Sequence, residues 1–356
     1  MNIPEPMQWL LANSGPAIRF QMIVDMLQEQ DVTRVSQALD DLHRSPIVSE
    51  WMARVGRGFE MKQLHSSNPL AFENVMGKLG DLGLRAGLQP FDTKTLPFRV
   101  WLSEGAKRAD DSPFRVFLRT LVASFLSFVG YGDTEPVHEV LVRRLKSLYS
   151  FAVSPSFQDI YTESYITHDV KQEKRKHRFL NPDLYFGQQL VLPWVHDIRG
   201  LAHSRKILDD PDLRHKAETV VSMVFSPEYQ DLPLGYGLIK HQERSYVIGW
   251  SVHLPGFESL PNDSSMPKIL LLLQSFASFR TARESDWFLR MMEILEGCST
   301  EYETYRFPKE WLPEKNAGYW VNGAYMALED DRQKKSAIEC ESTFRMLKIK
   351  HLMTRQ

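Results

Sequence analysis

The feature that most constrains the fold is a series of prolines, each placed where an α-helix would begin. Most of them follow a residue that suits a helix start: Gly15-Pro16, Ser45-Pro46, Asn68-Pro69, Ser112-Pro113, Asn181-Pro182 and Asp210-Pro211. Leu96-Pro97 and Glu135-Pro136 continue the series without a good cap. Proline suits the first helical turn because it has no N–H to leave unpaired and its φ angle is already helical. The series therefore predicts one helix, or one helical hairpin, in each interval.

Apolar residues after these prolines recur every three or four positions, as on one face of a helix. Further helices are expected after Asp31, over 266–280 and 285–297, and from about Gln333 to His351. Two stretches break the pattern, near 152–180 and 226–262, and the second holds a hairpin-like sequence between Tyr236 and Trp250. We therefore expect a single all-α domain over 1–356 with irregular insertions near these two stretches.

Composition narrows the class of protein. The 356 residues are 43% apolar and 25% charged, which excludes a disordered or collagen-like chain. With 43 basic against 45 acidic residues, no overall field attracts nucleic acid, and we expect no nucleic-acid partner. Two cysteines are too few for a disulfide scaffold.

The expected location is the cytoplasm. The first residues carry no basic segment ahead of a continuous apolar stretch, so a cleaved signal is not indicated. The longest apolar run, over 269–273, is far shorter than the roughly 20 residues that span a bilayer. Peripheral contact with a membrane through one apolar helix stays open, and the oligomeric state is not predicted.

Several segments resemble bacterial proteins of the prenyltransferase and squalene–hopene cyclase group. The likeness is spread over most of the chain, in Trp9–Phe20, Gly130–Asp133, Pro227–Gly237, Gly249-Trp250, Gly318–Val321 and Glu341–Phe344. It implies an (α/α) toroid, in which antiparallel helical hairpins form two rings around a central cavity. It also implies an apolar ligand for that cavity, with isoprenoids as one class.

The catalytic motifs of this group are not found. The terpenoid cyclases protonate an alkene with a DxDD motif, and related enzymes hold diphosphate through a DDxxD motif; the chain contains neither. The zinc-site motif of the protein prenyltransferases is not located either. No catalytic residue is therefore carried over from the group, and we expect no metal and no cofactor.

The segment 182–203 places polar groups on a predicted apolar helix. His196 and Asp197 are adjacent, so on a helix they point about 100° apart and cannot act as a dyad. Asp197 is interpreted as a buried acceptor, paired with Arg199 or with another helix; an acid or base that faces a cavity and a metal ligand are the alternatives. His196 is a further catalytic candidate.

Glu341 lies on the apolar side of the predicted last helix, close to Ile338 and Phe344 in the helical repeat. A carboxylate there either pairs, for instance with Arg345 at i+4, or points into a cavity. If Glu341 were buried without a partner, its pKa would rise and it could act as a general acid.

Aromatic residues supply the candidate lining of the cavity. Their π faces could stabilise carbocations, as the resemblance implies, or they could simply fill the seams between helices. The candidate substrate-binding residues are Tyr185, Trp194, Tyr236, Trp250, Tyr305, Arg306, Tyr319 and Trp320.

Three functions are open from the sequence. The favoured one is a terpenoid cyclase-like or prenyltransferase-like protein that binds an apolar small molecule, with Asp197 or Glu341 as an unorthodox acid if it is an enzyme. The second is a non-catalytic toroid that serves binding or assembly. The third is a carbohydrate-active α/α-barrel enzyme, which would use two carboxylates beside a cleft that stacks sugars.

Overall fold

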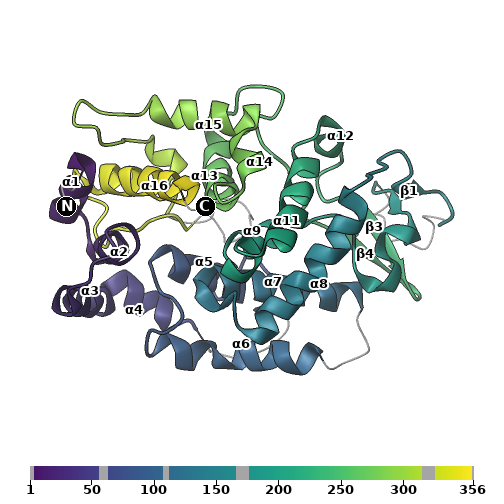
Figure 1. The fold of residues 1–356 in the computed structure, drawn as a ribbon, viewed down its shortest axis with the longest axis horizontal. Helices are drawn as coiled ribbons and strands as arrows, with labels where there is room; N and C mark the ends of the chain where they lie inside the picture. Colours follow the sequence, from purple (N-terminus) through teal and green to yellow (C-terminus); the bar gives the residue numbers. More distant parts are fainter. Residues whose placement is uncertain (1–3, 56–62, 107–111, 166–175, 315–324, 355–356) are drawn as a thin grey trace. The chain divides into compact units, whose positions relative to one another are not determined.

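A computed structural model describes residues 4–55, 63–106, 112–165, 176–314 and 325–354, and it is mostly helical, with 59% helix and 6% strand (Figure 1). The chain forms two compact units. The terminal unit consists of Met1–Pro97 and Pro255–Gln356, and the central unit of Phe98–Leu254. The single domain expected from the sequence stays a prediction.

The first half of the terminal unit is a succession of short helices. They are α1 (Glu5–Asn13), α2 (Pro16–Gln21) with a π-helical continuation (Met22–Met26), α3 (Val32–Arg44), α4 (Pro46–Met52), α5 (Phe72–Asp81) and α6 (Phe91–Ala106), which runs on into the central unit. Consecutive helices pack together, α2 with α3, α3 with α4 and α4 with α5. The mostly helical content of this region agrees with the sequence prediction.

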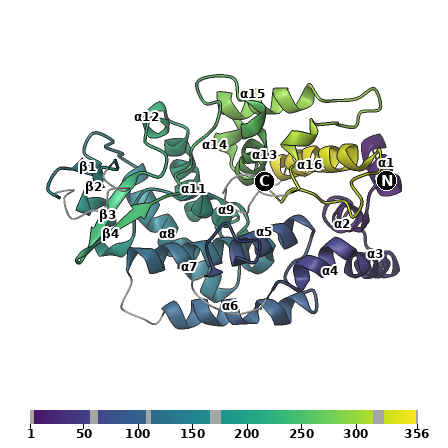
Figure 2. The same ribbon diagram turned by 180° about the vertical axis from the view of Figure 1, so that it is seen from behind.

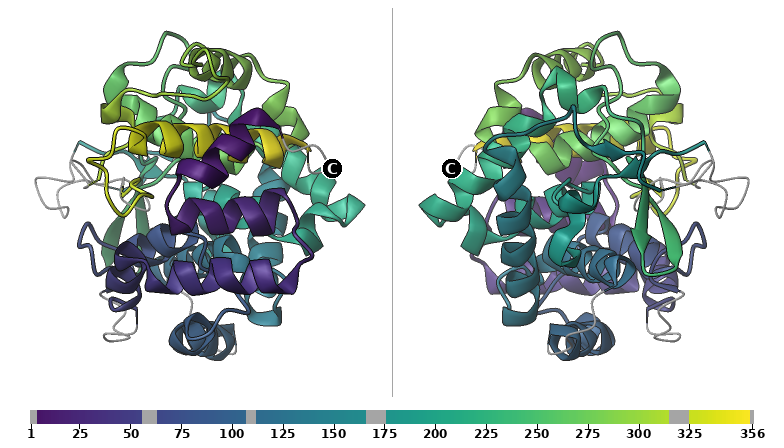
Figure 3. Two further views of the ribbon diagram at one scale, coloured as in Figure 1. Left: turned by 90° about the vertical axis from the view of Figure 1, so that its left-hand side faces the viewer. Right: turned by 90° about the vertical axis from the view of Figure 1, so that its right-hand side faces the viewer.

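The second half of the terminal unit holds the C-terminal helices. They are α13 (Met266–Phe276), α14 (Arg280–Arg283), α15 (Asp286–Glu296) and α16 (Ala337–Thr354), with 3₁₀ turns at Asp263–Ser265 and Lys309–Trp311. The last helix packs against α1, α2 and α13, so the first and last helices of the chain are neighbours (Figure 3, left). The buried apolar residues of α16 include Phe344, Met346 and Ile349.

The central unit is built on α7 (Pro113–Leu126), whose residues from Val116 to Leu126 are all buried. A π-helical turn (Ser127–Tyr131) follows, then α8 (Glu135–Ala152), α9 (Val195–Ala202), α10 (Arg205–Leu208), α11 (Pro211–Val224) and α12 (Pro227–Gln230). α7 packs against both α8 and α9. At Gly200 of α9 an added Cβ would lie 2.5 Å from Leu141 Cδ2 and 3.2 Å from Ser124 Cα, so glycine permits the close approach of α9 to α7 and α8.

A small sheet completes the central unit (Figure 2). Its strands are β1 (Tyr161–Thr162), β2 (Phe179–Leu180), β3 (Gly237–His241) and β4 (Arg244–Ile248), in the order β1-β2-β3-β4. β3 and β4 form the antiparallel hairpin that the sequence predicts, while β2 pairs with β3 in parallel at Phe179 and Leu238. The segment 182–203, predicted to be one helix, begins with a 3₁₀ turn (Pro182–Gln188). It is α-helical only over α9, Val195–Ala202.

The prolines mark helix starts with two corrections. Pro16, Pro46, Pro113 and Pro211 open helices, and Pro136 is the second residue of α8. Pro97, in contrast, lies inside α6, which begins at Phe91 directly after another proline, Pro90.

The second correction concerns Pro69. The side chain of Asn68 accepts the N–H of Leu70 and forms a local turn, so α5 begins only at Phe72. Competing hydrogen bonds of this kind are why asparagine marks turns as well as helix starts.

One segment, Pro113–Tyr131, is long and apolar enough to cross a membrane by length and composition. In the fold 78% of its apolar window is buried against other parts of the chain, as in a core helix. This segment is therefore weak support for a membrane span.

Candidate functional site

Asp197 lies at the start of α9, where its carboxylate accepts hydrogen bonds from the helix backbone and from an arginine. Its Oδ2 accepts the backbone N–H of Trp194 at 2.9 Å and so caps the helix. The guanidinium of Arg144, on α8, donates to both oxygens, from Nε to Oδ1 at 3.0 Å and from Nη2 to Oδ2 at 2.9 Å. The partner of Asp197 is thus on another helix, as one sequence alternative had it, and is not Arg199.

Arg144 is fixed by more than its ion pair. Its Nη1 donates to the backbone oxygen of Leu190 at 2.6 Å, and its guanidinium lies 4.5 Å from the centre of the Trp194 ring. The Arg144 and Asp197 side chains are 2% and 0% exposed. A bidentate pair in such a site is costly to break, because removing either partner would leave the other charge buried and uncompensated.

Two tyrosines extend this cluster. The hydroxyl of Tyr236 donates to the backbone oxygen of Pro193 at 2.5 Å and lies 2.5 Å from the hydroxyl of Tyr229. The Tyr229 hydroxyl in turn accepts the N–H of Val252 at 3.1 Å. Burial raises the pKa of both tyrosines well above the ordinary value, so they act as neutral hydrogen-bonding groups.

The structure therefore brings four of the predicted residues together at the start of α9. Trp194, Asp197 and Tyr236 are linked as described, and the backbone oxygen of Trp250 accepts the N–H of Val195 at 2.9 Å. We call these residues, with Arg144, the α9 cluster.

Two other predicted residues of the central unit have different surroundings. His196 is fully buried, edge-on to the rings of Phe117 at 5.3 Å and Phe125 at 6.1 Å. Tyr185 lies at the sheet, where its hydroxyl accepts the N–H of Lys240 at 3.3 Å, and burial raises its pKa to about 12.

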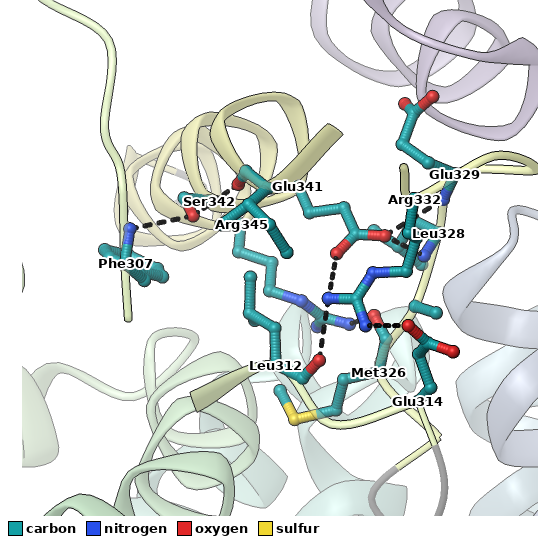
Figure 4. Close-up of polar contacts among 12 residues, drawn as sticks. Phe307, Leu312, Glu314, Met326, Leu328, Glu329, Arg332, Glu341, Ser342 and Arg345 are labelled. Carbon is teal, nitrogen blue, oxygen red and sulfur yellow. Dashed lines mark hydrogen bonds and ion pairs between the residues drawn. The ribbon is translucent and has the colours of Figure 1, made fainter. Parts of the chain in front are cut away.

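Glu341, on α16 of the terminal unit, is also committed to partners (Figure 4). Its Oε1 accepts the backbone N–H groups of Leu328 at 2.7 Å and Glu329 at 3.0 Å. Its Oε2 accepts from Arg332 Nη2 at 2.7 Å. The prediction that Glu341 pairs with Arg345 at i+4 is wrong, because Arg345 contacts other groups.

Those other groups lie on α5 and in the segment that begins at Tyr325. Arg345 donates to the backbone oxygen of Met326 at 2.7 Å and lies 3.8 Å from the carboxylate of Asp81. Lys78, 2% exposed, donates to the backbone oxygens of Tyr325, at 3.1 Å, and of Ala327. Burial lowers the pKa of Lys78 to about 7, although the charges of Asp81 and Glu341 oppose the shift.

These contacts define a strap, Tyr325–Asp330, which is neither helix nor strand. Its residues from Tyr325 to Glu329 are buried, so their backbone polar groups need partners within the protein. Three charged side chains, Lys78, Glu341 and Arg345, supply partners that a sheet would otherwise provide.

The last two residues of the strap hold the starts of two N-terminal helices. Both carboxylate oxygens of Glu329 accept the N–H of Gly15, at 2.8 and 2.9 Å, just before α2. Asp330 accepts from the hydroxyl of Ser45 at 2.7 Å and the N–H of Ile47 at 3.2 Å, at the start of α4. Burial, followed by the charge of Glu341, raises the pKa of Glu329 to about 7 against the pull of the Gly15 hydrogen bond.

Sequence reasoning missed Lys78, Glu329 and Asp330. No local signal in the sequence points to Glu329, because the N–H group that it accepts belongs to Gly15, the residue before α2, and is 314 residues away in the chain.

The remaining predicted residues belong neither to the α9 cluster nor to the contacts of the strap. The Tyr305 hydroxyl donates to Glu296 Oε2 at 2.6 Å and accepts from Lys350 at 2.7 Å. Arg306, 55% exposed, forms a 3.4 Å ion pair with Glu339. Tyr319 and Trp320 lie outside the described residues.

The described residues offer no metal centre, because no three of their His, Cys, Asp or Glu side chains are close enough together to hold an ion. No family model, no curated protein and no solved structure matches the chain.

Proposed function

We propose that this chain is a non-catalytic helical scaffold that serves binding or assembly. The observation that carries the proposal is the complete pairing of the two carboxylates predicted to be catalytic. Asp197 is held by Arg144 and by a backbone N–H, and Glu341 by Arg332 and two backbone N–H groups. An acid that starts a cyclisation has to present its carboxyl group to the substrate, whereas the oxygens of these two side chains are turned to donors of the protein itself.

The finer architecture of the proposal is the (α/α) toroid implied by the resemblance. The packing of consecutive helices within each unit, such as α3 with α4 and α7 with α8, supports a repeat of helical hairpins. An apolar ligand, isoprenoid or other, would fit the scaffold as a bound molecule rather than as a substrate.

The terpenoid cyclase-like or prenyltransferase-like activity and the carbohydrate-active alternative stay predictions. Each would need an acid other than the two committed ones. Glu329 has a pKa near neutrality, but its carboxylate is turned to the Gly15 N–H.

The test compares Asp197→Asn and Glu341→Gln with the intact chain. Turnover of isoprenoid diphosphates and of squalene, and the lipid extracted from purified protein, are measured by mass spectrometry, and thermal unfolding is followed beside them. The scaffold predicts no turnover by any form and a lower unfolding temperature for both variants.

Asp212→Asn is the matched control, because Asp212 is exposed and pairs only with Lys216 among the ion pairs described for it. It should unfold like the intact chain. Turnover by the intact chain that Asp197→Asn abolishes at an unchanged unfolding temperature would overturn the proposal.

A further inference from the structure

The two acids at the end of the strap differ in their surroundings although they have the same task. Each accepts the N–H of a residue at the start of a proline-initiated helix, Glu329 at Gly15 and Asp330 at Ile47. Glu329 is 4% exposed, whereas Asp330 belongs to the exposed residues. Only the first of the pair is therefore held where its charge is costly.

We propose that the strap is a charge-controlled latch: it holds the α1–α2 turn most tightly when Glu329 is uncharged, and that contact opens more often when Glu329 loses its proton. The other anchors of the strap, from Lys78, Arg345 and Glu341, keep its remaining length in place. The latch is independent of the scaffold function proposed above.

The carboxylates near Glu329 favour its uncharged form, whereas Lys334 and the Gly15 N–H favour its charged form. Glu341, on α16, and Asp330, next in the chain, repel a charge on Glu329, and Lys334 attracts it. Arg332 is already paired with Glu341. The α1–α2 turn contributes the backbone N–H of Gly15.

The contact is also close. A Cβ added at Gly15 would lie 2.8 Å from Glu329 Oε2, so the carboxyl group rests against the Gly15 backbone, and Glu329 is 4% exposed. Because one shared N–H is a small replacement for the water that a carboxylate binds in solution, burial outweighs the hydrogen bond. The balance agrees with the direction of the pKa shift, in which burial is the largest cause.

The size of the effect follows from linkage. With a pKa of about 7 in the closed contact and the ordinary 4.5 once opened to water, the opening constant rises about tenfold between about pH 6 and about pH 8. The shift changes the population of a local opening, and the rest of the fold is retained.

The experiment is hydrogen exchange of the intact chain over this pH range, read at the amides of Gly15 and of Ile47 and corrected for the intrinsic rate. We expect the opening constant to rise about tenfold at Gly15 and to change much less at Ile47. An opening constant at Gly15 that stays level over the range would overturn the latch.

Two variants separate charge from shape. Glu329→Gln keeps an oxygen for Gly15 and cannot ionise, so it should stay protected at about pH 8 and lose the pH dependence. Asp330→Asn, at the exposed acid, should keep the tenfold rise at Gly15. A Glu329→Gln chain that still shows the rise would assign it to another group and overturn the proposal.

Discussion

Arg144 and Asp197 join α8 to α9 through two parallel hydrogen bonds, and neither side chain is more than 2% exposed. The same carboxylate caps α9 through the N–H of Trp194. One residue therefore fixes both the start of a helix and its position against a neighbour. A pair of this kind is costly to break, since the remaining charge stays buried without its counter-charge.

Arg332 pairs with two carboxylates, one buried and one exposed, so the contributions of the two pairs to stability can be compared. Arg332 also lies 3.2 Å from Glu314, whose side chain is 51% exposed, while that of Glu341 is 0% exposed. We expect Glu341→Gln to lower the free energy of unfolding by about 3–5 kcal/mol. Glu314→Gln should change it by about 1 kcal/mol or less, because water screens an exposed pair. Equal effects in urea denaturation would contradict the structural role of Glu341.

Gly200 tests the packing of the central unit. We expect Gly200→Ala to lower the free energy of unfolding by about 1–3 kcal/mol, because the added methyl group would meet Leu141 and the backbone at Ser124. At Gly249 an added Cβ meets no atom within 4 Å, so Gly249→Ala is the control and should be nearly neutral. Thermal or urea unfolding of the two variants measures the difference, and a harmless Gly200→Ala would refute this packing.

The hydroxyl of Tyr236 should be structural rather than catalytic. Tyr236→Phe would leave the Pro193 oxygen and the Tyr229 hydroxyl short of a buried partner, at a cost of about 1–3 kcal/mol. Tyr302→Phe is the comparison, because Tyr302 is 64% exposed. The prediction fails if both substitutions leave the free energy of unfolding unchanged.

The pH dependence of stability has two opposed contributions in the terminal unit. Glu329 has a folded pKa of about 7, above its ordinary 4.5, so its stabilising contribution is full below pH 4.5 and is lost as the pH rises through 7. Lys78 has a folded pKa of about 7, below its ordinary 10.5, so its contribution is lost as the pH falls from 10.5 to 7. Together they place a minimum in unfolding free energy near pH 7.

Single substitutions remove each contribution to the pH dependence of the unfolding free energy separately. Glu329→Gln should remove the loss on the acid side, and Lys78→Met the loss on the alkaline side. Urea denaturation at a series of pH values, taken as the difference between variant and intact chain, isolates each group from the rest of the protein. A difference for Glu329→Gln that is constant from about pH 5 to about pH 8 would contradict the assignment.

Local signals in the sequence predict the helices and the hairpin well. Pro46 with Ser45 as its cap, and Asp31 as the cap of α3, are complete within a few residues, so a linear pattern is sufficient to find them. The prediction that Pro97 begins a helix is wrong. The helix, α6, begins at Phe91, directly after Pro90, and it contains Pro97 in its interior.

For the candidate site, the sequence predicts which polar residues are buried but not which residues they pair with. Asp197 was interpreted as a buried acceptor from its apolar neighbours, but its partner is 53 residues away, and the partner of Gly15 is 314 residues away. Such pairings depend on how helices pack in space. The strap was missed for a related reason, since it is extended chain whose hydrogen bonds go to side chains and leave no periodic pattern.

The most direct test of the structural role of the predicted acids is the free energy of unfolding across the Arg144–Asp197 pair. Asp197→Asn should lose about 3–5 kcal/mol, while the double replacement Asp197→Leu with Arg144→Met, which removes both charges of the pair, should lose less than that single change. If Asp197→Asn unfolds at the free energy of the intact chain, the carboxylate is not held by its pair and the account is contradicted.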